Sequence, residues 1–524
     1  MLRPYPFAQG CEVKQGIVYL IGAGPGDPGL ITVKGLECLR RADVVVYDYL
    51  ANPVFLDEAS PEAERIYVGK KKGCHHQSQE GINRVLEEKA LAGKIVARLK
   101  GGDPYVFGRG GEEALHLHRA GIPFEVVPGV TAGFAAAAYA GIPLTHRDYT
   151  TSLGLVTGHE DPAKKMSSLD WEKLATGVGT LVFYMGMANL PLITEKLIAH
   201  GRSPATPVAI IRWATTPRQE TLVATLGDVV EKVVESGIKP PAVIVVGEVV
   251  GLREELRWFD NRPLFGKRVM VTRTAEQARQ FVALLAAQGA EAVCCPTIAT
   301  AAPESWTEID AAIAALDRTD FLILTSTNAV DAFFDRLAEV GADVRSLAGV
   351  KIVAVGPKTA GAIRARGIAP DLVPEEYRAE GVVALLKEQG IAGRRVLYPR
   401  ASLARDLIPA ELAAAGAEIS APVAYRTVAP SGGGKRIRDL LTAGEIDAVT
   451  FTSSSTVDNF VDLVGPAAVD LLRKVDVVSI GPLTTRTAER LGLTVAVQPA
   501  TYTLEGMLEA MLEYYGQGRQ WQKP

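Results

Sequence analysis

Glycines and ionisable residues follow five strand-like runs near the start of the sequence. The runs lead into Gly22–Pro28, Asp48, Gly69–Lys70, Gly101–Pro104 and Pro128–Ala132. In open α/β sheets, ligands bind beyond the carboxyl ends of the strands, and a glycine there lets the backbone come close to a ligand. A carboxylate or a lysine at such a place can also exchange protons with a substrate. The five strand ends together predict a ligand site, and their bare backbone suits a neutral or zwitterionic cofactor better than a pyrophosphate.

The first of these loops invites a second interpretation. Gly22 and Gly24 match the first two glycines of the dinucleotide fingerprint GxGxxG, but Asp27 replaces the third, and Pro25 and Pro28 block the usual helix start. Taken alone, the loop could equally be a tight structural turn. A nicotinamide-dependent dehydrogenase fused to a cleft-type binding module is therefore a disfavoured alternative.

Positive charge collects in the same region. The residues concerned are Lys70, Lys71, Lys72, His75, His76, Arg98, Lys100 and Arg109. They predict a basic rim for an anionic ligand, with a solvated surface as the alternative. Cys74, His75 and His76 could suggest a metal, but adjacent residues rarely converge on one ion, and we predict no metal site.

The elements that must position these residues alternate between strand and helix patterns. The strands expected first are 16–21, 43–47, 66–68, 95–99 and 124–127, which is typical of α/β layers. A polar break with proline at 260–263 separates two halves. We expect an N-terminal extension at 1–15, a first domain at 16–260, a linker at 261–265 and a second domain at 266–524.

The second half contains an internal repeat. The segments that start at Gly266, Phe321 and Val350 match those that start at Gly393, Ala448 and Val475, with offsets of 127, 127 and 125 residues. These offsets are too long for a solenoid and predict two similar α/β lobes with a cleft between them. Hydroxyl-rich turns stand where strands should lead into helices. Such residues are usually N-caps, but helix N-termini that face one cleft can also form a carboxylate-binding surface. The turns are Thr325-Ser326, Ser453–Ser455, Lys358-Thr359 and Thr484-Thr485.

Composition narrows the class of protein. The 524 residues are 48% hydrophobic and 22% charged, and the net charge is −4. This is a globular composition without a general case for nucleic-acid or membrane binding. Five cysteines without a CxxC pair fit a reducing compartment. The start has prolines where a signal peptide needs an apolar core, and the apolar stretches are shorter than a bilayer span. We expect a soluble, cytoplasmic protein.

Longer motifs of the first half resemble those of uroporphyrinogen-III C-methyltransferases. They cover about residues 16–260 and read, in order, GAGPGDP, VYDYL, VGKKKGCHHQSQEGIN, RLKGGDPYVFGRGGEEA, GIPFEVVPGVTAGFAAAAYAGIPLTHRD, LVFYMG, IIRWATTPRQET and VIVVGEVVGLREELRWF. The resemblance implies a two-lobed tetrapyrrole methylase fold and a homodimer formed through this half. It also implies methylation of uroporphyrinogen III at C2 and C7 to precorrin-2, with S-adenosyl-L-methionine as donor and S-adenosyl-L-homocysteine as product.

The same resemblance implies roles for single residues. Asp48 would accept a proton and Lys70 would donate one, which fits a reaction in which a pyrrole carbon attacks a sulfonium methyl and a proton then leaves the ring. The many carboxylates of the substrate would explain the basic rim. At Ala214 the family often has glycine. The implied cofactor contacts are Pro25, Gly101, Gly102, Asp103, Val106, Thr131, Ala132, Met185, Ala214 and Ala242.

The second half, over about 264–510, resembles uroporphyrinogen-III synthases. The motifs in order are TSTNAVDAFF, VAVGPKTA, YPRASLARDLIPAEL, APVAYRTV, TFTSSSTV and SIGPLTTRTAERLGL. The resemblance implies cyclisation of hydroxymethylbilane with loss of water and inversion of ring D. It implies lobes of about 264–300 with 428–524, and 301–427. It assigns Tyr425 as the catalytic proton donor and Ser326, Thr359 and Thr484 as substrate contacts.

The two resemblances together predict a fold class and a function. We expect an α/β protein in which a two-lobed methylase domain precedes a two-lobed synthase-like domain. The second half would make the tetrapyrrole that the first half methylates, in sirohaem or cobalamin synthesis. The alternative is a methyltransferase whose C-terminal half only binds or senses a tetrapyrrole.

Overall fold

The computed structural model describes residues 16–69, 78–159, 169–402, 404, 406–430 and 432–516. The chain forms two compact units. Among the described residues, the first contains 16–268, 284–291 and 512–516, and the second contains 269–283 and 292–511. No helix in these ranges is both long enough and apolar enough to cross a membrane.

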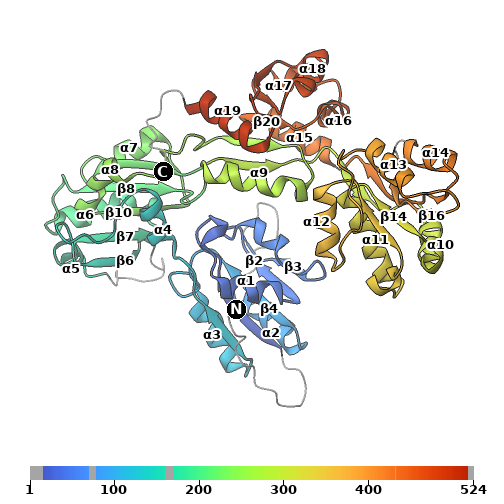
Figure 1. The fold of residues 1–524 in the computed structure, drawn as a ribbon. Coiled ribbons are helices and arrows are strands. Elements are labelled where there is room, and N and C mark those ends of the chain that lie inside the picture. Colours follow the sequence, from blue (N-terminus) through green and yellow to red (C-terminus); the bar gives the residue numbers. More distant parts are fainter. Residues whose placement is uncertain are drawn as a thin grey trace. The chain divides into compact units, whose positions relative to one another are not determined.

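The first sheet of the first unit is parallel, in the order β3-β2-β4-β1-β5 (Figure 1). Its strands are β1 (Ile17–Gly22), β2 (Val44–Tyr47), β3 (Glu64–Tyr67), β4 (Ile95–Lys100) and β5 (Phe124–Val127). The helices α2 (Gln79–Leu91) and α3 (Gly110–Arg119) pack on one face, and α1 (Val33–Arg40) packs on the other. The five predicted strands are confirmed. Because they are parallel, their carboxyl ends meet at one edge.

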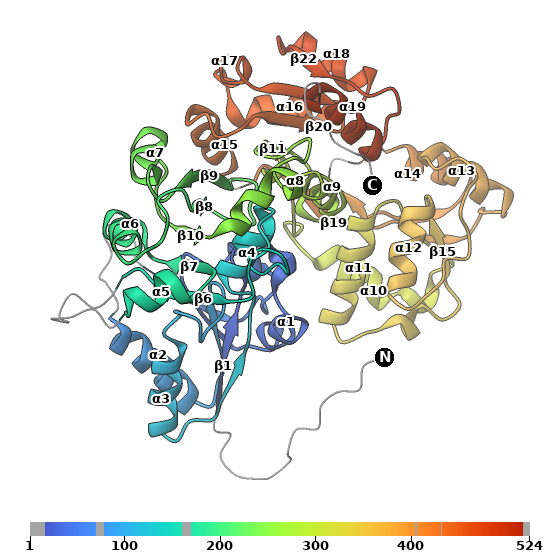
Figure 2. The same cartoon turned by 90° about the vertical axis from the view of Figure 1, so that its left-hand side faces the viewer.

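The second sheet of this unit is mixed, in the order β6-β7-β10-β8-β9 (Figure 2). Its strands are β6 (Leu153–Thr157), β7 (Thr180–Tyr184), β8 (Pro207–Arg212), β9 (Glu220–Thr225) and β10 (Ala242–Val246). One face carries α5 (Trp171–Gly177), α6 (Leu190–Ala199) and α7 (Val229–Ser236). The other carries α4 (Ala132–Tyr139), whose small residues let it lie close to the strands. The helix α8 (Arg253–Leu256) follows β10.

In the second unit, the internal repeat of the sequence forms two sheets with corresponding strand orders. One sheet runs β12-β11-β20-β21-β22 and another runs β15-β14-β16-β18. In the repeat, β12, β11, β20 and β21 correspond to β18, β16, β14 and β15. The four strands of the second sheet therefore have the same order as the first four strands of the other sheet, when one of the two is counted from its opposite edge. These strands are β11 (Arg268–Val271), β12 (Glu291–Cys294), β14 (Phe321–Leu324), β15 (Lys351–Ala354), β16 (Arg395–Leu397), β18 (Glu418–Ser420), β20 (Ala448–Phe451), β21 (Asp476–Ser479) and β22 (Val495–Val497).

Helices and a short third sheet complete the second half. The third sheet has the order β13-β19-β17, from β13 (Ala299–Ala301), β17 (Arg400–Ala401) and β19 (Val423–Val428). The helices are α9 (Ala275–Ala287), α10 (Thr307–Ala314), α11 (Thr327–Glu339), α12 (Pro357–Ala365), α13 (Ala379–Glu388), α14 (Leu407–Ala414), α15 (Gly433–Thr442), α16 (Ser454–Val464), α17 (Ala468–Leu472), α18 (Pro482–Arg490) and α19 (Leu504–Gly516). The hydroxyl-rich turns do begin helices. Ser326 caps α11 and Ser453 caps α16 through its side chain.

Candidate functional site

A pocket of about 690 Å³ opens at the carboxyl edge of the first sheet, inside the first unit. Its wall takes residues from the ends of β1, β2 and β4 and, from the second sheet, residues at the end of β7 and β8 and the start of β10. The site predicted from strand ends is therefore a real concavity, and both sheets of the unit build it.

The pocket brings together residues that lie far apart in the sequence. Asp48 lines it, and so do all ten positions for which the sequence implied a cofactor contact. These ten are Pro25, Gly101, Gly102, Asp103, Val106, Thr131, Ala132, Met185, Ala214 and Ala242. Lys70, Lys71, Lys72, Cys74, His75 and His76 lie outside the described residues.

Unusual backbone conformations cluster around this pocket. Five described residues other than glycine have a left-handed φ, and four of them line the pocket: Phe107 (53°), Arg109 (58°), Met185 (54°) and Trp213 (46°). Such conformations cost about 1–3 kcal/mol each and persist where the surroundings enforce them, often at functional sites. Met185 is 53% exposed although the preceding Tyr184 is buried.

Glycines in the pocket wall and in the loops behind it have two different roles. A Cβ on Gly22 would lie 2.5 Å from the Gly129 nitrogen, and one on Gly129 would lie 2.4 Å from the Gly102 oxygen. A Cβ on Gly101 would lie 2.6 Å from the Cβ of Leu50. These glycines let chain segments pack on one another. At Gly102, where φ is +71°, a Cβ would meet nothing closer than the Ala132 nitrogen at 3.5 Å, so among these four glycines Gly102 is the one that leaves room for a ligand.

Asp103 joins two of the predicted loops. Its Oδ1 accepts hydrogen bonds from the backbone nitrogens of Tyr105 (2.8 Å) and Val106 (3.1 Å), and its Oδ2 accepts one from Gly129 (3.0 Å). The carboxylate thus holds the loop after β4 against the loop after β5. A similar bond fixes the start of α4, where Tyr184 Oη accepts the Gly133 N–H at 2.9 Å and lies 2.8 Å from Thr131 Oγ1.

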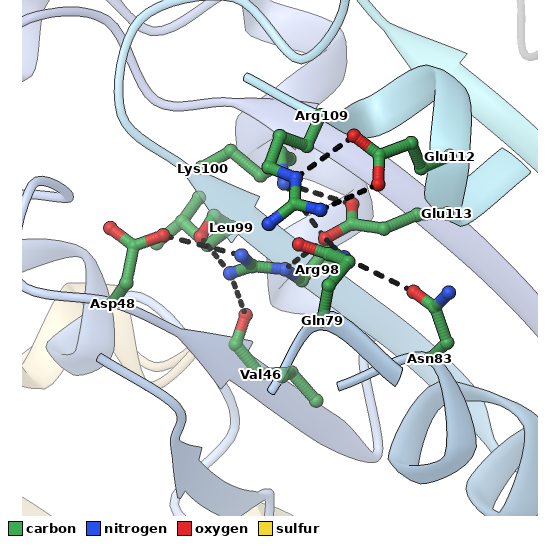
Figure 3. A network of polar contacts seen from close by, with 10 residues as sticks. All are labelled: Val46, Asp48, Gln79, Asn83, Arg98, Leu99, Lys100, Arg109, Glu112 and Glu113. Atoms are coloured by element: carbon green, nitrogen blue, oxygen red, sulfur yellow. Dashed lines mark hydrogen bonds and ion pairs between the residues drawn. The ribbon is translucent and has the colours of Figure 1, made fainter. Parts of the chain in front are cut away.

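A network of buried charges supports Asp48 (Figure 3). The Asp48 Oδ1 accepts the Leu50 N–H at 3.0 Å, and its Oδ2 accepts Arg98 Nη2 at 3.3 Å. Arg98 Nε donates to Glu113 Oε1 at 3.2 Å, and Lys100 Nζ lies 2.8 and 2.9 Å from the two Glu113 oxygens. Burial, followed by the adjacent Arg98, lowers the pKa of Lys100, and Glu113 opposes this shift.

Two residues of the predicted basic rim, Arg98 and Lys100, line the pocket but are buried. Arg98 is 3% exposed and Lys100 is 4% exposed, and both bond to Glu113, which is fully buried. Arg109 is bonded to Glu112 at 2.7 Å. The sequence reasoning missed Glu113. The signal available was the alternation of β4, which puts two cations on the apolar face of Val96 and so requires a buried anion.

Four residues form a clasp between the glycine loop and the second sheet; the clasp consists of Asp27, Tyr139, Thr215 and Gln219. The Tyr139 hydroxyl donates to Asp27 Oδ2 at 2.6 Å, and the Asp27 N–H donates to Thr215 Oγ1 at 2.9 Å. Gln219 accepts the Thr215 N–H at 3.0 Å and donates to the Tyr139 carbonyl at 3.2 Å. The clasp lies beside Pro25 and Ala214, which line the pocket.

The predicted residues of the second half fall into two environments. Ser326 Oγ lies 3.0 Å from the hydroxyl of Tyr425, and both residues are half-buried. The Tyr425 side chain packs on the apolar core that β14 and β15 form with α11 and α12. Thr359 and Thr484 are each 4% exposed, near the starts of α12 and α18. The structure thus pairs Ser326 with Tyr425, and leaves the two threonines little surface for a ligand.

Two family descriptions match the chain. Tetrapyrrole (Corrin/Porphyrin) Methylases match residues 17–230, and Uroporphyrinogen-III synthase HemD matches residues 279–509. The first match covers the whole first sheet and four of the five strands of the second sheet, all except β10, so the first half is a tetrapyrrole methylase.

Individual relatives match as well. A protein of Ruminiclostridium josui named Porphyrin biosynthesis protein HemD is 38% identical over 504 residues, which make up 96% of this chain and 99% of that protein. The uroporphyrinogen-III C-methyltransferase of Bacillus subtilis (strain 168) is 45% identical over 335 residues, 64% of this chain and 68% of that protein. A crystal structure of uroporphyrin-III C-methyl transferase from Thermus thermophilus, complexed with S-adenyl homocysteine, is 43% identical, with a TM-score of 0.39, over 45% of this chain and 99% of that one.

The chain belongs to the family of fusions in which a tetrapyrrole methylase precedes a uroporphyrinogen-III synthase of the HemD type. It is a bifunctional enzyme of tetrapyrrole biosynthesis.

Proposed function

We propose that the second half cyclises hydroxymethylbilane to uroporphyrinogen III and that the first half methylates this product at C2 and C7 to precorrin-2. S-adenosyl-L-methionine is the proposed methyl donor. The observation that carries the methylation is the common pocket, since the ten family positions and Asp48 line one cavity. A size of about 690 Å³ is within the range of small-molecule sites.

The pocket residues fit this cofactor. Gly102 leaves open space where any other residue would place a Cβ, and the backbone around Thr131 and Met185 offers neutral contacts suited to an adenosyl group and an amino acid. When bound, the cofactor supplies an electrophilic methyl group for in-line attack by a pyrrole carbon. The chain's own part is to orient the ring and to remove its proton.

Asp48 is the proposed proton acceptor. An ionised carboxylate has about four lone-pair sites, and the Leu50 N–H and Arg98 occupy one on each oxygen. The side chain is 22% exposed and faces the pocket, so acceptor sites remain for a substrate proton. Lys70 is kept as the proposed proton donor, because it matches the family motif next to Gly69, which lines the same pocket.

For the second half we propose that Tyr425 protonates the departing hydroxyl of hydroxymethylbilane. The hydrogen bond to Ser326 supports this role, because it fixes the phenol direction, and Ser326 is itself fixed by accepting the Ala329 N–H at 3.0 Å. Ser326, Thr359 and Thr484 are the proposed substrate contacts. For the two buried threonines, contact requires a local opening of the helix start.

One incubation tests both activities. The full chain is given hydroxymethylbilane with and without S-adenosyl-L-methionine, and products are followed by absorbance, isomer analysis and mass. Uroporphyrinogen III without the donor, and a product two methyl groups heavier with it, are expected. If only the type I isomer formed and uroporphyrinogen III were still methylated when supplied, the second half would be a binding or sensing module.

We propose further that the protein is a cytoplasmic homodimer that assembles through its methylase half. The three cysteines among the described residues are free thiols, which fits a reducing compartment, and the family membership supports the dimer. Light scattering after size exclusion should give about twice the chain mass of 55.8 kDa. A mass of one chain at micromolar concentration would reject the dimer.

A further inference from the structure

A row of alternating side chains on β4 links the interior of the first sheet to the pocket. Leu99 belongs to the core on one face, whereas Val96 belongs to the core under α2 and α3 on the other. Arg98 and Lys100 follow Val96 at intervals of two, so they share its face. On β4 this face starts with the apolar Val96 and is cationic at the next two positions, Arg98 and Lys100, where the strand reaches the pocket.

Glu113 compensates these two cations. It reaches the row from α3 with no exposed surface, and its oxygens accept bonds from Lys100, Arg98 and Gln79 Nε2, the last at 3.2 Å. A buried carboxylate is stable only when it is paired and hydrogen-bonded. Here four donated bonds meet that requirement.

The Arg98 guanidinium connects this interior pair to Asp48. Its Nε is bonded to Glu113, its Nη2 to Asp48, and its Nη1 to the Leu99 carbonyl at 3.0 Å and the Val46 carbonyl at 3.5 Å (Figure 3). All three nitrogens are engaged, so the planar group cannot turn without breaking several bonds. The Asp48 oxygen is thereby held by a group fixed to the core.

We propose that Arg98 is a positioning residue for the Asp48 carboxylate and that Glu113, by holding Arg98 and Lys100, sets the charge that Asp48 meets. This inference rests on the proposed role of Asp48 as proton acceptor. Neither Arg98 nor Glu113 transfers a proton itself. Their function is to direct the Asp48 oxygen toward the substrate and to keep the site electrically balanced.

The charges around Asp48 predict the direction in which each substitution changes its protonation. Among the described residues, the ionisable groups of this network are Arg98, Lys100, Glu113 and the Tyr49 phenol, and the Arg109–Glu112 ion pair beside Glu113 and Lys100 adds no net charge. Two cations and two carboxylates give a net charge of zero when Asp48 is ionised, and +1 when it is protonated. Loss of the Arg98 charge makes protonation of Asp48 easier, and loss of the Glu113 charge makes it harder. Variants at the two residues should therefore have opposite effects.

The test is the pH profile of the single-turnover methylation rate, measured with uroporphyrinogen III and S-adenosyl-L-methionine on the full chain. In Arg98→Gln, which removes a cation 3.3 Å from Asp48, the acid limb should move up by about 1 pH unit. In Glu113→Gln it should move down by a smaller amount, because Glu113 contacts Arg98 and Lys100 rather than Asp48. Arg98→Lys separates charge from geometry. Its limb should stay near the wild-type position while the plateau rate falls about tenfold or more, because one ammonium cannot form the bridge.

Control measurements distinguish misfolding and general charge effects from a failure of the proposed roles of Asp48 and Arg98. Arg40→Gln changes an exposed arginine of the same half and should leave the profile unchanged. Affinity for S-adenosyl-L-homocysteine and the melting temperature show whether each variant is folded, and if Glu113→Gln is not, the two Arg98 variants decide. If Asp48→Asn keeps its rate, the proposed acceptor role itself is lost. If Asp48→Asn is inactive but the limb in Arg98→Gln stays in place, only the positioning role is overturned.

Discussion

The clasp at the glycine loop leads to a prediction about cofactor affinity. The Tyr139 hydroxyl is 2.6 Å from Asp27 Oδ2, and Asp27 in turn donates its N–H to Thr215. Burial and the Asp27 carboxylate raise the pKa of Tyr139 well above its ordinary value of 10, so its hydroxyl remains a proton donor at every pH at which the enzyme is assayed. Tyr139→Phe removes this donor and keeps the ring, which packs on Trp258 and Phe259.

The strength of the Tyr139–Asp27 hydrogen bond sets the expected change in cofactor affinity. A hydrogen bond to a charged group contributes about 1.5–3 kcal/mol. Asp27 is half-buried and keeps the Gly29 N–H bond at 2.8 Å, so water can replace part of the loss. If the ordered conformation of the loop becomes less stable by about 1.4 kcal/mol, the affinity for the cofactor falls tenfold. We expect the Kd for S-adenosyl-L-homocysteine to rise about five- to tenfold.

Isothermal titration calorimetry measures this change, with a melting curve for each variant. Tyr149→Phe is a suitable control, because Tyr149 is an exposed tyrosine of the same half, 50% exposed. Asp27→Asn, which keeps an oxygen to accept the Tyr139 hydroxyl, should weaken binding less than Tyr139→Phe. An unchanged Kd in a Tyr139→Phe protein would refute the idea that the clasp orders the pocket.

Three further predictions concern a glycine pair, a tyrosine and a thiol. Gly101→Ala should lower the free energy of unfolding by about 1–3 kcal/mol, because its Cβ overlaps with Leu50. Gly102→Ala should cost about 1–2 kcal/mol in backbone strain and raise the cofactor Kd at least tenfold. Calorimetry and melting curves measure both effects, and the reverse pattern would contradict the assignment. Tyr425→Phe should slow uroporphyrinogen III formation by about ten- to a thousandfold and raise the share of the type I isomer, and an unchanged rate and isomer ratio in a stable variant would exclude Tyr425 from the mechanism. Burial raises the pKa of Cys295 from 9 to about 11. From pH 9 to 11 the unfolded state therefore binds fewer protons than the folded state, and the free energy of unfolding falls as the pH rises. Cys295→Ser should remove about 2 kcal/mol of that fall, which denaturant unfolding at several pH values would show or refute.

The sequence by itself determined the order of the elements and most of the pocket wall. The strands of the first sheet are visible because apolar runs end in glycines and charged residues, and this local pattern needs no knowledge of distant contacts. Asp48 and most of the residues implied as cofactor contacts follow strands of the first sheet, and all of them lie within motifs long enough to be recognised. The repeat in the second half likewise predicted two sheets, which share a strand order.

Only the tertiary structure decided which of these residues work together. The sequence treats Arg98 and Lys100 as part of a basic surface, because it does not show that Glu113 of α3 lies over β4. It interprets Gly101 as space for a ligand, although its missing Cβ makes room for Leu50. The partnership of Tyr139 with Asp27 spans 112 residues. Burial and pairing depend on how elements pack, and that packing brings together residues whose spacing along the chain carries no signal of contact.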